Sequence, residues 1–454
     1  MPCGTNKFLG TTIHSQSKSM IKLYFKQAWT MMKQNKLFTS IYVAGTGLSI
    51  ALVMTLFIIF YVKFASVYPE YNRNRTLVVS TTKRINKANE GNWSTNSGTS
   101  WKFTNGLLGN LKNAVAVAGV AEGWNIKQEI SRIGSEEVVE VKPKYVNGGF
   151  WQVFTFDFTD GHPFTTEEVE AVQPVVVISK SLAEQMFANP SSTGEKLFLN
   201  GKEFTVCGVV KDVSNATPAS AADIWIPITH NAQAIADNPN LDLMGGIVNY
   251  LLAPTVGDKD ALRAEVQDII NKYNQQDETY RHEFFGQPDD YWKSTFRGGM
   301  AEEFFETWDL LKEYIYILLA FLIIPALNLS GMISNRMDSR MSELGVRKAY
   351  GATNRQIITQ VLWENLLITL MGGVVGLLLS YGIVLTAKQW ILTLFDRFIM
   401  NPNQSMDISF EMLFNPVVFG SALLFCILLN LISALIPTGW ALRRSIIQSI
   451  HTKR

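Results

Sequence analysis

The chain has 454 residues, of which 47% are hydrophobic and 17% charged, and this length favours two or more structural units. Its 40 basic and 39 acidic residues give a net charge of +1, which excludes a globally basic nucleic-acid-binding protein and an acidic disordered chain. The three cysteines, Cys3, Cys207 and Cys426, are scattered, which excludes a disulfide scaffold and a cysteine-based zinc site.

Four long segments contain no Asp, Glu, Lys or Arg. They are residues 37–62, 314–335, 365–387 and 412–442. Because about 20 helical residues cross the hydrocarbon core of a bilayer, each segment is long enough to span a membrane. The alternative, buried core helices of a large soluble protein, is disfavoured by four such segments in one chain. The predicted fold class is an α-helical membrane protein with four transmembrane helices and a large α+β extracytoplasmic domain inserted between spans one and two.

The charges between these spans predict the orientation of the chain. Residues 1–36 carry six lysines and no acid, residues 336–364 carry five basic and three acidic residues, and residues 443–454 carry four basic residues and no acid. The insert 63–313 has 23 basic and 33 acidic residues. The positive-inside rule therefore places both termini and residues 336–364 in the cytoplasm, and the insert and the loop 388–411 outside.

The N-terminal region differs from the rest of the chain. Residues 1–19 are rich in Ser, Thr and Gly and predict a disordered tail, and either Met1 or Met20 could be the start of the protein. Residues 20–36 repeat apolar side chains at helical spacing, with lysines on the other faces. This pattern predicts an interfacial helix in contact with lipids of the inner leaflet, and a plain extension of the first transmembrane helix, 37–62, is the equal alternative.

The insert, whose core domain we place at residues 63–300, mixes strand and helix patterns. Residues 174–178 read PVVVI and predict a buried strand, followed by a short helix that Ser179 or Ser181 caps. Asn200-Gly201 lies between two apolar runs and predicts a β-hairpin, because both residues of its turn need a positive φ.

The second half of the insert carries three further predictions. Residues 223–228 predict a strand, with Pro227 at an edge or an end. Residues 256–276 predict an amphipathic helix, and residues 301–335 a stalk that continues into the second span. Cys207 has no partner cysteine in this domain, so we expect a buried, inert thiol.

The sequence lacks the usual catalytic motifs. The five histidines form no HExxH and no metal-spaced cluster, and neither GxSxG nor the phosphate-binding GxxxxGK[ST] occurs. Asp289 and Asp290 follow Pro288 and are expected in a solvated turn. The spans contain no ionisable residue of the kind that builds a proton relay. We therefore expect no catalytic residue, no metal site, no cofactor and no enzymatic activity in this chain.

The cytoplasmic segment 336–364 predicts a helix, a turn and a second helix. Glu343 lies four residues before Arg347, a spacing that stabilises a short helix. Gly351 fits the C-terminal cap of that helix, and Thr353 fits the N-terminal cap of the next one. A helix that docks on a soluble partner and a basic loop that only holds the topology are equal alternatives at this point.

Small residues recur on one face of the third predicted span, 365–387. Gly372 and Gly376 form a GxxxG pattern, and Ser380 follows one turn later. Such a face lets two helices approach closely. It predicts helix packing, either between two copies of this chain in a dimer or within one protomer.

The segment RMSELGVRKAYGATNRQII resembles the signature of the MacB/FtsX-like ABC transporter permeases, roughly R-x-x-E-[IL]-G-[IV]-R-[RK]-A-x-G-A-x-x-x-[QE]-I. Parts of the insert, among them PVVVISKSLAEQMF and GEKLFLNGKEFTVCGVVKDV, resemble the MacB-like periplasmic core domain. The matching positions of the signature are Arg340, Glu343, Leu344, Gly345, Val346, Arg347, Lys348, Ala349, Gly351, Ala352, Gln356 and Ile357.

This resemblance implies a permease of the bacterial inner membrane that works with an ABC ATPase subunit. ATP and Mg²⁺ would be bound by that partner, because the fused ATPase domain of the macrolide exporters is absent here. A second permease, identical or paralogous, would complete the complex, and a periplasmic adaptor and an outer-membrane channel are further partners that the family allows. The residues expected to couple to the ATPase are Arg340, Glu343, Leu344, Gly345, Val346, Arg347, Lys348 and Gly351.

Three functions follow from this interpretation. The first is an efflux or lipoprotein-type extrusion system, in which ATP hydrolysis drives conformational work in the periplasm. The second is an FtsX-like signalling subunit that controls cell-wall hydrolases. The third is a membrane sensor or adaptor that works without an ATPase. The sequence does not name the cargo.

Overall fold

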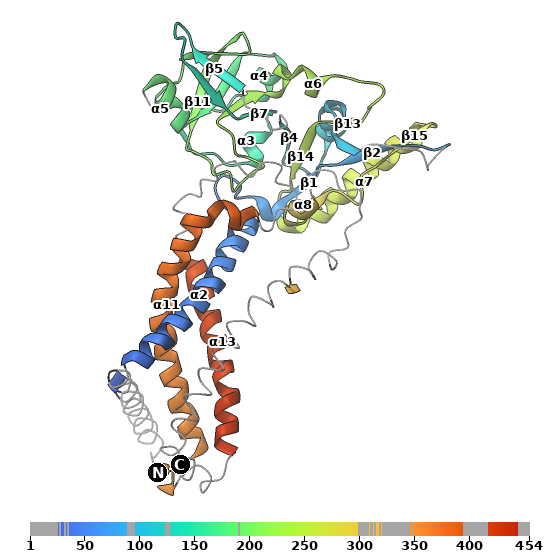
Figure 1. The fold of residues 1–454 in the computed structure, drawn as a ribbon. Coiled ribbons are helices and arrows are strands. Elements are labelled where there is room, and N and C mark those ends of the chain that lie inside the picture. Colours follow the sequence, from blue (N-terminus) through green and yellow to red (C-terminus); the bar gives the residue numbers. More distant parts are fainter. Residues whose placement is uncertain are drawn as a thin grey trace, which may run out of the picture. The chain divides into compact units, whose positions relative to one another are not determined.

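The structure, a computed structural model, divides the chain into two compact units (Figure 1). The first, here the helical unit, comprises residues 1–59, 311–388 and 413–454, and the second, here the mixed unit, comprises residues 60–310 and 389–412. Apart from isolated positions, the residues that the structure describes are 36–88, 96–122, 128–188, 191–297, 346–393 and 416–443.

Several predicted segments lie outside these described residues. They are the tail 1–19, nearly all of the interfacial helix 20–36, nearly all of the stalk and second span 301–335, and the tail 443–454 beyond its first residue. These segments remain predictions from the sequence.

Three long helices form the described part of the helical unit, namely α2 (Lys36–Phe64), α11 (Asn354–Thr393) and α13 (Pro416–Arg443). Within α2 and α11, the stretches Thr39–Ile58 and Asn354–Thr386 are long and apolar enough to cross a membrane, and α13 begins with a shorter apolar stretch. The first residues of the predicted loop 388–411 are helical instead, because residues 388–393 contain neither Gly nor Pro and continue α11 to Thr393.

The helices of this unit lie side by side (Figure 1) and share a buried cluster. Ile50 and Met54 of α2 pack with Ala422 and Cys426 of α13, and Leu377 of α11 packs against them. Since lipid is as apolar as these side chains, close van der Waals packing is what holds such helices together.

The mixed unit is built on a branched sheet, and its strands follow one another in the order β15-β2-β3-β14-β4-β7-β12-β9-β11-β10-β5-β6. The strands are β1 (Thr76–Val79), β2 (Thr82–Asn86), β3 (Asn96–Thr99), β4 (Ala116–Glu122), β5 (Gln128–Arg132), β6 (Val138–Val141), β7 (Pro143–Val146), β8 (Phe158–Gly161), β9 (Val175–Ser179), β10 (Lys196–Leu199), β11 (Lys202–Val210), β12 (Ile224–Pro227), β13 (Met244–Gly245), β14 (Ile247–Leu252), β15 (Tyr280–Glu283) and β16 (Asp289–Asp290).

Short helices and one longer helix accompany this sheet. They are α3 (Phe150–Val153), α4 (Thr166–Glu170), α5 (Lys180–Phe187), α6 (Ala232–Ile235), α7 (Lys259–Gln276) and α8 (Tyr291–Arg297), with the single turns η1 (Arg73–Arg75), η2 (Lys102–Leu107), η3 (Leu108–Asn110), η4 (Ile228–His230) and η5 (Val256–Asp258).

The local predictions in the middle of the insert are confirmed. The PVVVI segment forms the buried strand β9, and the Ser179 hydroxyl accepts a hydrogen bond from the Leu182 amide at the start of α5. Asn200 and Gly201 have φ of +50° and +74° and connect β10 to β11 as an antiparallel hairpin. Pro227 ends β12, a strand that pairs with neighbours on both sides, β7 and β9.

Two hydrophobic cores fill the mixed unit. The larger core lies around β9, β11 and β12 and includes the fully buried Trp225. The second core receives one face of α7, where Leu262, Val266 and Ile270 are buried as the helical spacing predicts.

Cys207 lies in the larger core, as expected for an inert thiol. Its Sγ atom donates to the carbonyl oxygen of Val176 at 3.3 Å, and burial raises the pKa of the thiol to about 12.

Candidate functional site

The predicted coupling segment 336–364 is described from Val346 onward. Val346 and Arg347 belong to a helical turn that ends at Tyr350, and α11 starts a few residues later. The other residues that the sequence assigns to ATPase coupling, apart from Gly351, lie outside the described part of the chain, namely Arg340, Glu343, Leu344, Gly345 and Lys348.

The turn between this segment and α11 has the caps that the sequence predicts. Gly351 has a φ of +89°, which only glycine adopts without strain, and the Ala352 amide donates to the Arg347 carbonyl at 3.0 Å. Thr353 and Gln356 then exchange hydrogen bonds between side chain and backbone, the Thr353 amide donating to Gln356 Oε1 at 2.9 Å. The turn at Gly351 therefore fixes the direction of the preceding residues, 346–350, relative to α11.

A second connection between the segment and α11 was not predicted. The Arg347 guanidinium donates to Gln360 Oε1 at 2.5 Å, and Gln360 Nε2 donates to Glu364 Oε1 at 3.1 Å. Gln360 and Glu364 are only 4% and 2% exposed. The contact between Gln360 and Glu364 could have been predicted from the sequence, because the two residues are four apart on one helical face. Glu364 also immediately precedes the apolar run.

Two apolar side chains beside Arg347 face away from the protein. Tyr350 is 88% exposed and Val346 is 47% exposed. An exposed tyrosine next to a cationic side chain is the composition that protein interfaces favour. This end of the helical unit is therefore the candidate functional site.

The small residues of α11 pack against α2 of the same chain. A Cβ atom added to Gly372 would lie 2.9 Å from Thr46 Cγ2, and one added to Gly376 would lie 2.8 Å from the Gly47 carbonyl oxygen. The Ser380 hydroxyl contacts Met54, 4.0 Å from its Sδ atom. These residues thus contact a helix of the same chain, which is one of the two arrangements that the sequence allows.

Replacing Gly376 with leucine should separate α2 from α11, because the added side chain meets backbone that cannot move aside. We expect a lower thermal midpoint of the full-length protein in detergent, measured by intrinsic fluorescence. Gly382→Leu is the matched control on the same helix, since a Cβ atom there has no neighbour within 4 Å among the described residues. Equal midpoints for the two variants would contradict close packing at Gly376.

In the mixed unit, a buried carboxylate joins the two ends of the domain, which predicted membrane spans precede and follow in the chain. Glu70, a few residues after α2, is 1% exposed and accepts hydrogen bonds from Arg73 Nε at 2.8 Å and from the Tyr291 hydroxyl of α8. The Ser220 amide and hydroxyl donate to the other carboxylate oxygen at 3.1 and 2.8 Å. Because α8 lies just before the predicted stalk, Glu70 connects the entry and the exit of the domain.

A second buried ion pair joins Asp289 of β16 to Arg297 of α8. Asp289 is 2% exposed and accepts from Arg297 at 2.5 Å and 3.1 Å. The prediction of a solvated turn at Asp289 and Asp290 was wrong, because β16 pairs with β1 and carries Asp289 into the interior, where Arg297 compensates its charge.

Replacing Glu70 with leucine should destabilise the mixed unit by about 3–5 kcal/mol, since Arg73 would stay buried without its carboxylate. The measurement is the urea midpoint of the full-length protein, followed by tryptophan fluorescence. Glu203→Leu removes a carboxylate from an exposed pair with Lys196 and should cost about 1 kcal/mol or less. A loss at Glu70 no larger than at Glu203 would contradict the role of the buried carboxylate.

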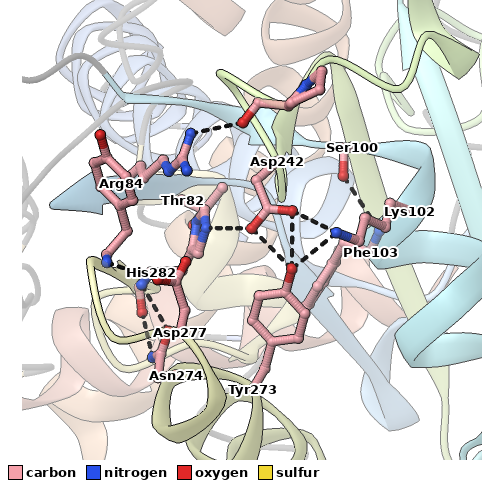
Figure 2. A network of polar contacts seen from close by, with 12 residues as sticks. Thr82, Arg84, Ser100, Lys102, Phe103, Asp242, Tyr273, Asn274, Asp277 and His282 are labelled. Carbon is pink, nitrogen blue, oxygen red and sulfur yellow. Dashed lines mark hydrogen bonds and ion pairs between the residues drawn. The ribbon is translucent and has the colours of Figure 1, made fainter. Parts of the chain in front are cut away.

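A polar network holds the loop before β13 against α7, β2 and β15 (Figure 2). The Asp242 carboxylate accepts from Lys102 Nζ at 2.6 Å, from the Tyr273 hydroxyl at 2.9 Å and from His282 Nε2 at 3.0 Å. Arg84 donates to the carbonyl oxygens of Pro239 and Asn240 in the same loop. These contacts hold the loop through its backbone and through one carboxylate.

The surroundings of His282 and Asp242 in this network shift the pKa values of both side chains. Burial lowers the pKa of His282 below 6.5, and its Nδ1 atom is buried without a hydrogen-bond partner in the described structure, so a second ring proton would meet no acceptor. Burial alone would raise the pKa of Asp242, but the hydrogen bonds from Lys102 and Tyr273 outweigh it and hold this pKa below its usual value.

The mixed unit should therefore lose stability in mild acid. Below about pH 6.5 the unfolded chain takes up a proton at His282 that the folded chain does not, so stability falls by about 1 kcal/mol between pH 7.5 and 5.5. Urea midpoints at the two pH values measure this loss, and His282→Gln should reduce it. An unchanged pH dependence in that variant would contradict the assignment to His282.

Comparison with known proteins places the chain in a family. The model of the MacB-like periplasmic core domain matches residues 39–269, and the model of the FtsX-like permease C-terminal domain matches residues 315–446. The uncharacterized ABC transporter permease YknZ of Bacillus subtilis (strain 168) is 22% identical over 250 residues, 54% of this chain and 58% of YknZ.

Other similar proteins include larger ones. The probable export ATP-binding/permease protein MacB of Pseudomonas entomophila (strain L48) is 26% identical over 263 residues, 55% of this chain and 36% of that protein. The matched region is thus less than two thirds of the length of either relative.

Solved structures also show similarity to the chain. The extracellular domain of the noncanonic ABC-type transporter YknZ from Gram-positive bacteria aligns with a TM-score of 0.31 and 18% identity, over 45% of this chain and 99% of that one. A domain of a putative permease protein from Porphyromonas gingivalis aligns with a TM-score of 0.36 and 14% identity, over 49% and 92%. Because the core-domain model spans half of the 454 residues and the permease model follows it, this chain belongs to the family of MacB/FtsX-like ABC transporter permeases.

Proposed function

We propose that this chain is the membrane subunit of a complex in which a separate ABC ATPase docks on the segment 336–364. ATP hydrolysis in that partner would move the segment, and the movement would reach the mixed unit outside the membrane. Membership of the permease family supports this proposal, as does the absence of a phosphate-binding loop from the 454 residues.

The proposed topology has four transmembrane helices, with both termini and the segment 336–364 in the cytoplasm of a bacterium and the mixed unit in the periplasm. The basic charge of the three cytoplasmic segments supports this orientation. The apolar stretches in α2 and α11 are long enough for two of these spans. A second permease, identical or paralogous, would complete the complex.

One observation carries the proposal furthest. Two fixed connections, the turn at Gly351 and the hydrogen bonds of Arg347, join α11 to a short segment that presents Tyr350 and Val346 to solvent. A surface loop with no partner needs neither a fixed direction nor exposed apolar side chains. A docking element needs both, because force passes only through a rigid connection.

Efflux or lipoprotein-type extrusion is the activity we propose for the complex. Several relatives with similar sequences are named macrolide export ATP-binding/permease proteins, for example that of Aggregatibacter actinomycetemcomitans, which is 24% identical over 249 residues. A periplasmic adaptor and an outer-membrane channel would be the further partners of an efflux complex.

Replacing Tyr350 with aspartate should weaken ATPase binding by about tenfold, the scale typical of an exposed aromatic residue in an interface. The chain is co-expressed with candidate ABC ATPases of the same organism, and the ATPase retained on the purified membrane protein is measured. Tyr71→Asp, at a half-exposed tyrosine of the mixed unit, is the control and should retain the ATPase.

Three outcomes would contradict the proposal. An unmodified chain that retains no ATPase would favour a sensor or adaptor. An ATPase that is retained equally by the Tyr350 variant would place its docking surface elsewhere. Release of a cell-wall hydrolase activity instead of transport would favour the FtsX-like signalling function.

A further inference from the structure

Three polar side chains span the turn at Gly351 and form one continuous chain of hydrogen bonds. Arg347 precedes the turn, and Gln360 and Glu364 follow it on α11. The guanidinium donates to the Gln360 carbonyl oxygen, and the Gln360 amide nitrogen donates to the Glu364 carboxylate. We call these three residues the polar relay.

The glutamine is oriented as electrostatics requires. Its carbonyl oxygen, the negative end of the amide dipole, points to a cation, and its amino group, the positive end, points to an anion. Glutamate at this position could not donate and lysine could not accept, whereas an amide does both. Gln360 therefore bridges Arg347 and Glu364, because it accepts a hydrogen bond from the one and donates a hydrogen bond to the other.

Burial makes this arrangement costly to break. Glu364 is 2% exposed and Gln360 4% exposed. A carboxylate that has left water needs donors with it, and the loss of one charge-assisted hydrogen bond weakens that compensation. Nearby, Ile357 and Val361 pack with Ala434 of α13, so the first turns of α11 are also held from the side.

We infer that Gln360 and Glu364 are positioning residues for the docking segment, by which we mean the helical turn from Val346 to Tyr350. By holding Arg347, they fix the angle between that segment and α11, so that a push on the segment moves α11 instead of bending the chain at Gly351. This inference rests on the proposed function for its purpose, but the fixed angle itself is a property of this chain alone.

The angle can be measured directly by electron spin resonance. Spin labels are attached at Tyr350→Cys and Val374→Cys, two exposed positions before and along α11, in full-length protein whose Cys3, Cys207 and Cys426 are replaced by alanine. The distance between the labels should show one narrow peak. In Gln360→Met, which keeps the size of the side chain but neither hydrogen bond, the narrow peak should be lost.

Matched variants separate the relay from a general effect on the helix. Glu364→Gln keeps an acceptor oxygen and should preserve the narrow peak, whereas Glu364→Met should not. Thr359→Val removes a hydroxyl on the same turn, outside the relay, and should change nothing. A narrow peak retained in both Gln360→Met and Glu364→Met would overturn the inference.

A second measurement, the stimulation of ATP hydrolysis in the bound ATPase, tests whether the polar relay contributes to coupling. With the ATPase bound, Gln360→Met should lower the stimulation of ATP hydrolysis by about tenfold while the amount of bound ATPase stays the same, since one charge-assisted hydrogen bond corresponds to such a factor. Unchanged stimulation would remove the positioning role. Failure of the unmodified chain to bind the ATPase would overturn the proposed function, while the label distances would still decide the fixed angle.

Discussion

A carboxylate can leave water only if a donor leaves with it, and this constraint joins the elements of both units. In the mixed unit Glu70 and Asp289 are almost fully buried, and each is held by an arginine, Arg73 and Arg297. In the helical unit Glu364 is held by Gln360, which is held in turn by Arg347. Each of these contacts joins two segments of the chain and fixes the direction of one relative to the other.

The packing of α11 against α2 in the helical unit depends on two residues that have no side chain. Gly372 and Gly376 let α11 approach the backbone of α2 at Thr46 and Gly47 more closely than any Cβ atom would permit. The contacts between the two helices continue as far as Ser380 and Met54. A displacement of α11 would therefore be shared by α2, the helix that precedes the mixed unit in the chain.

The sequence predicted features that a few neighbouring residues determine. The hairpin at Asn200-Gly201 and the cap at Gly351 follow from residues that tolerate a positive φ, and the buried face of α7 follows from its periodicity. The family also followed from a local motif and was confirmed by the comparisons.

The features that the sequence did not predict depend on partners far away in the chain. Tyr291 lies 221 residues from Glu70, and Ser220 lies 150 residues from it, so no spacing rule connects them. Asp289 was expected in solvent because its burial depends on the pairing of β16 with β1, a strand far away in the chain, although its ion-pair partner Arg297 is close in sequence. The Asp242 network draws its donors from three separate elements for the same reason.

The central claim is that force applied at the docking segment reaches the mixed unit, and hydrogen exchange in the assembled complex tests it most directly. Amide exchange is compared with and without a non-hydrolysable ATP analogue bound to the ATPase, at residues 65–73 and 214–220, which meet at Glu70. The account predicts that nucleotide changes exchange at these amides in the unmodified chain and not in a chain whose relay is broken. Identical exchange with and without nucleotide in the unmodified chain would contradict it.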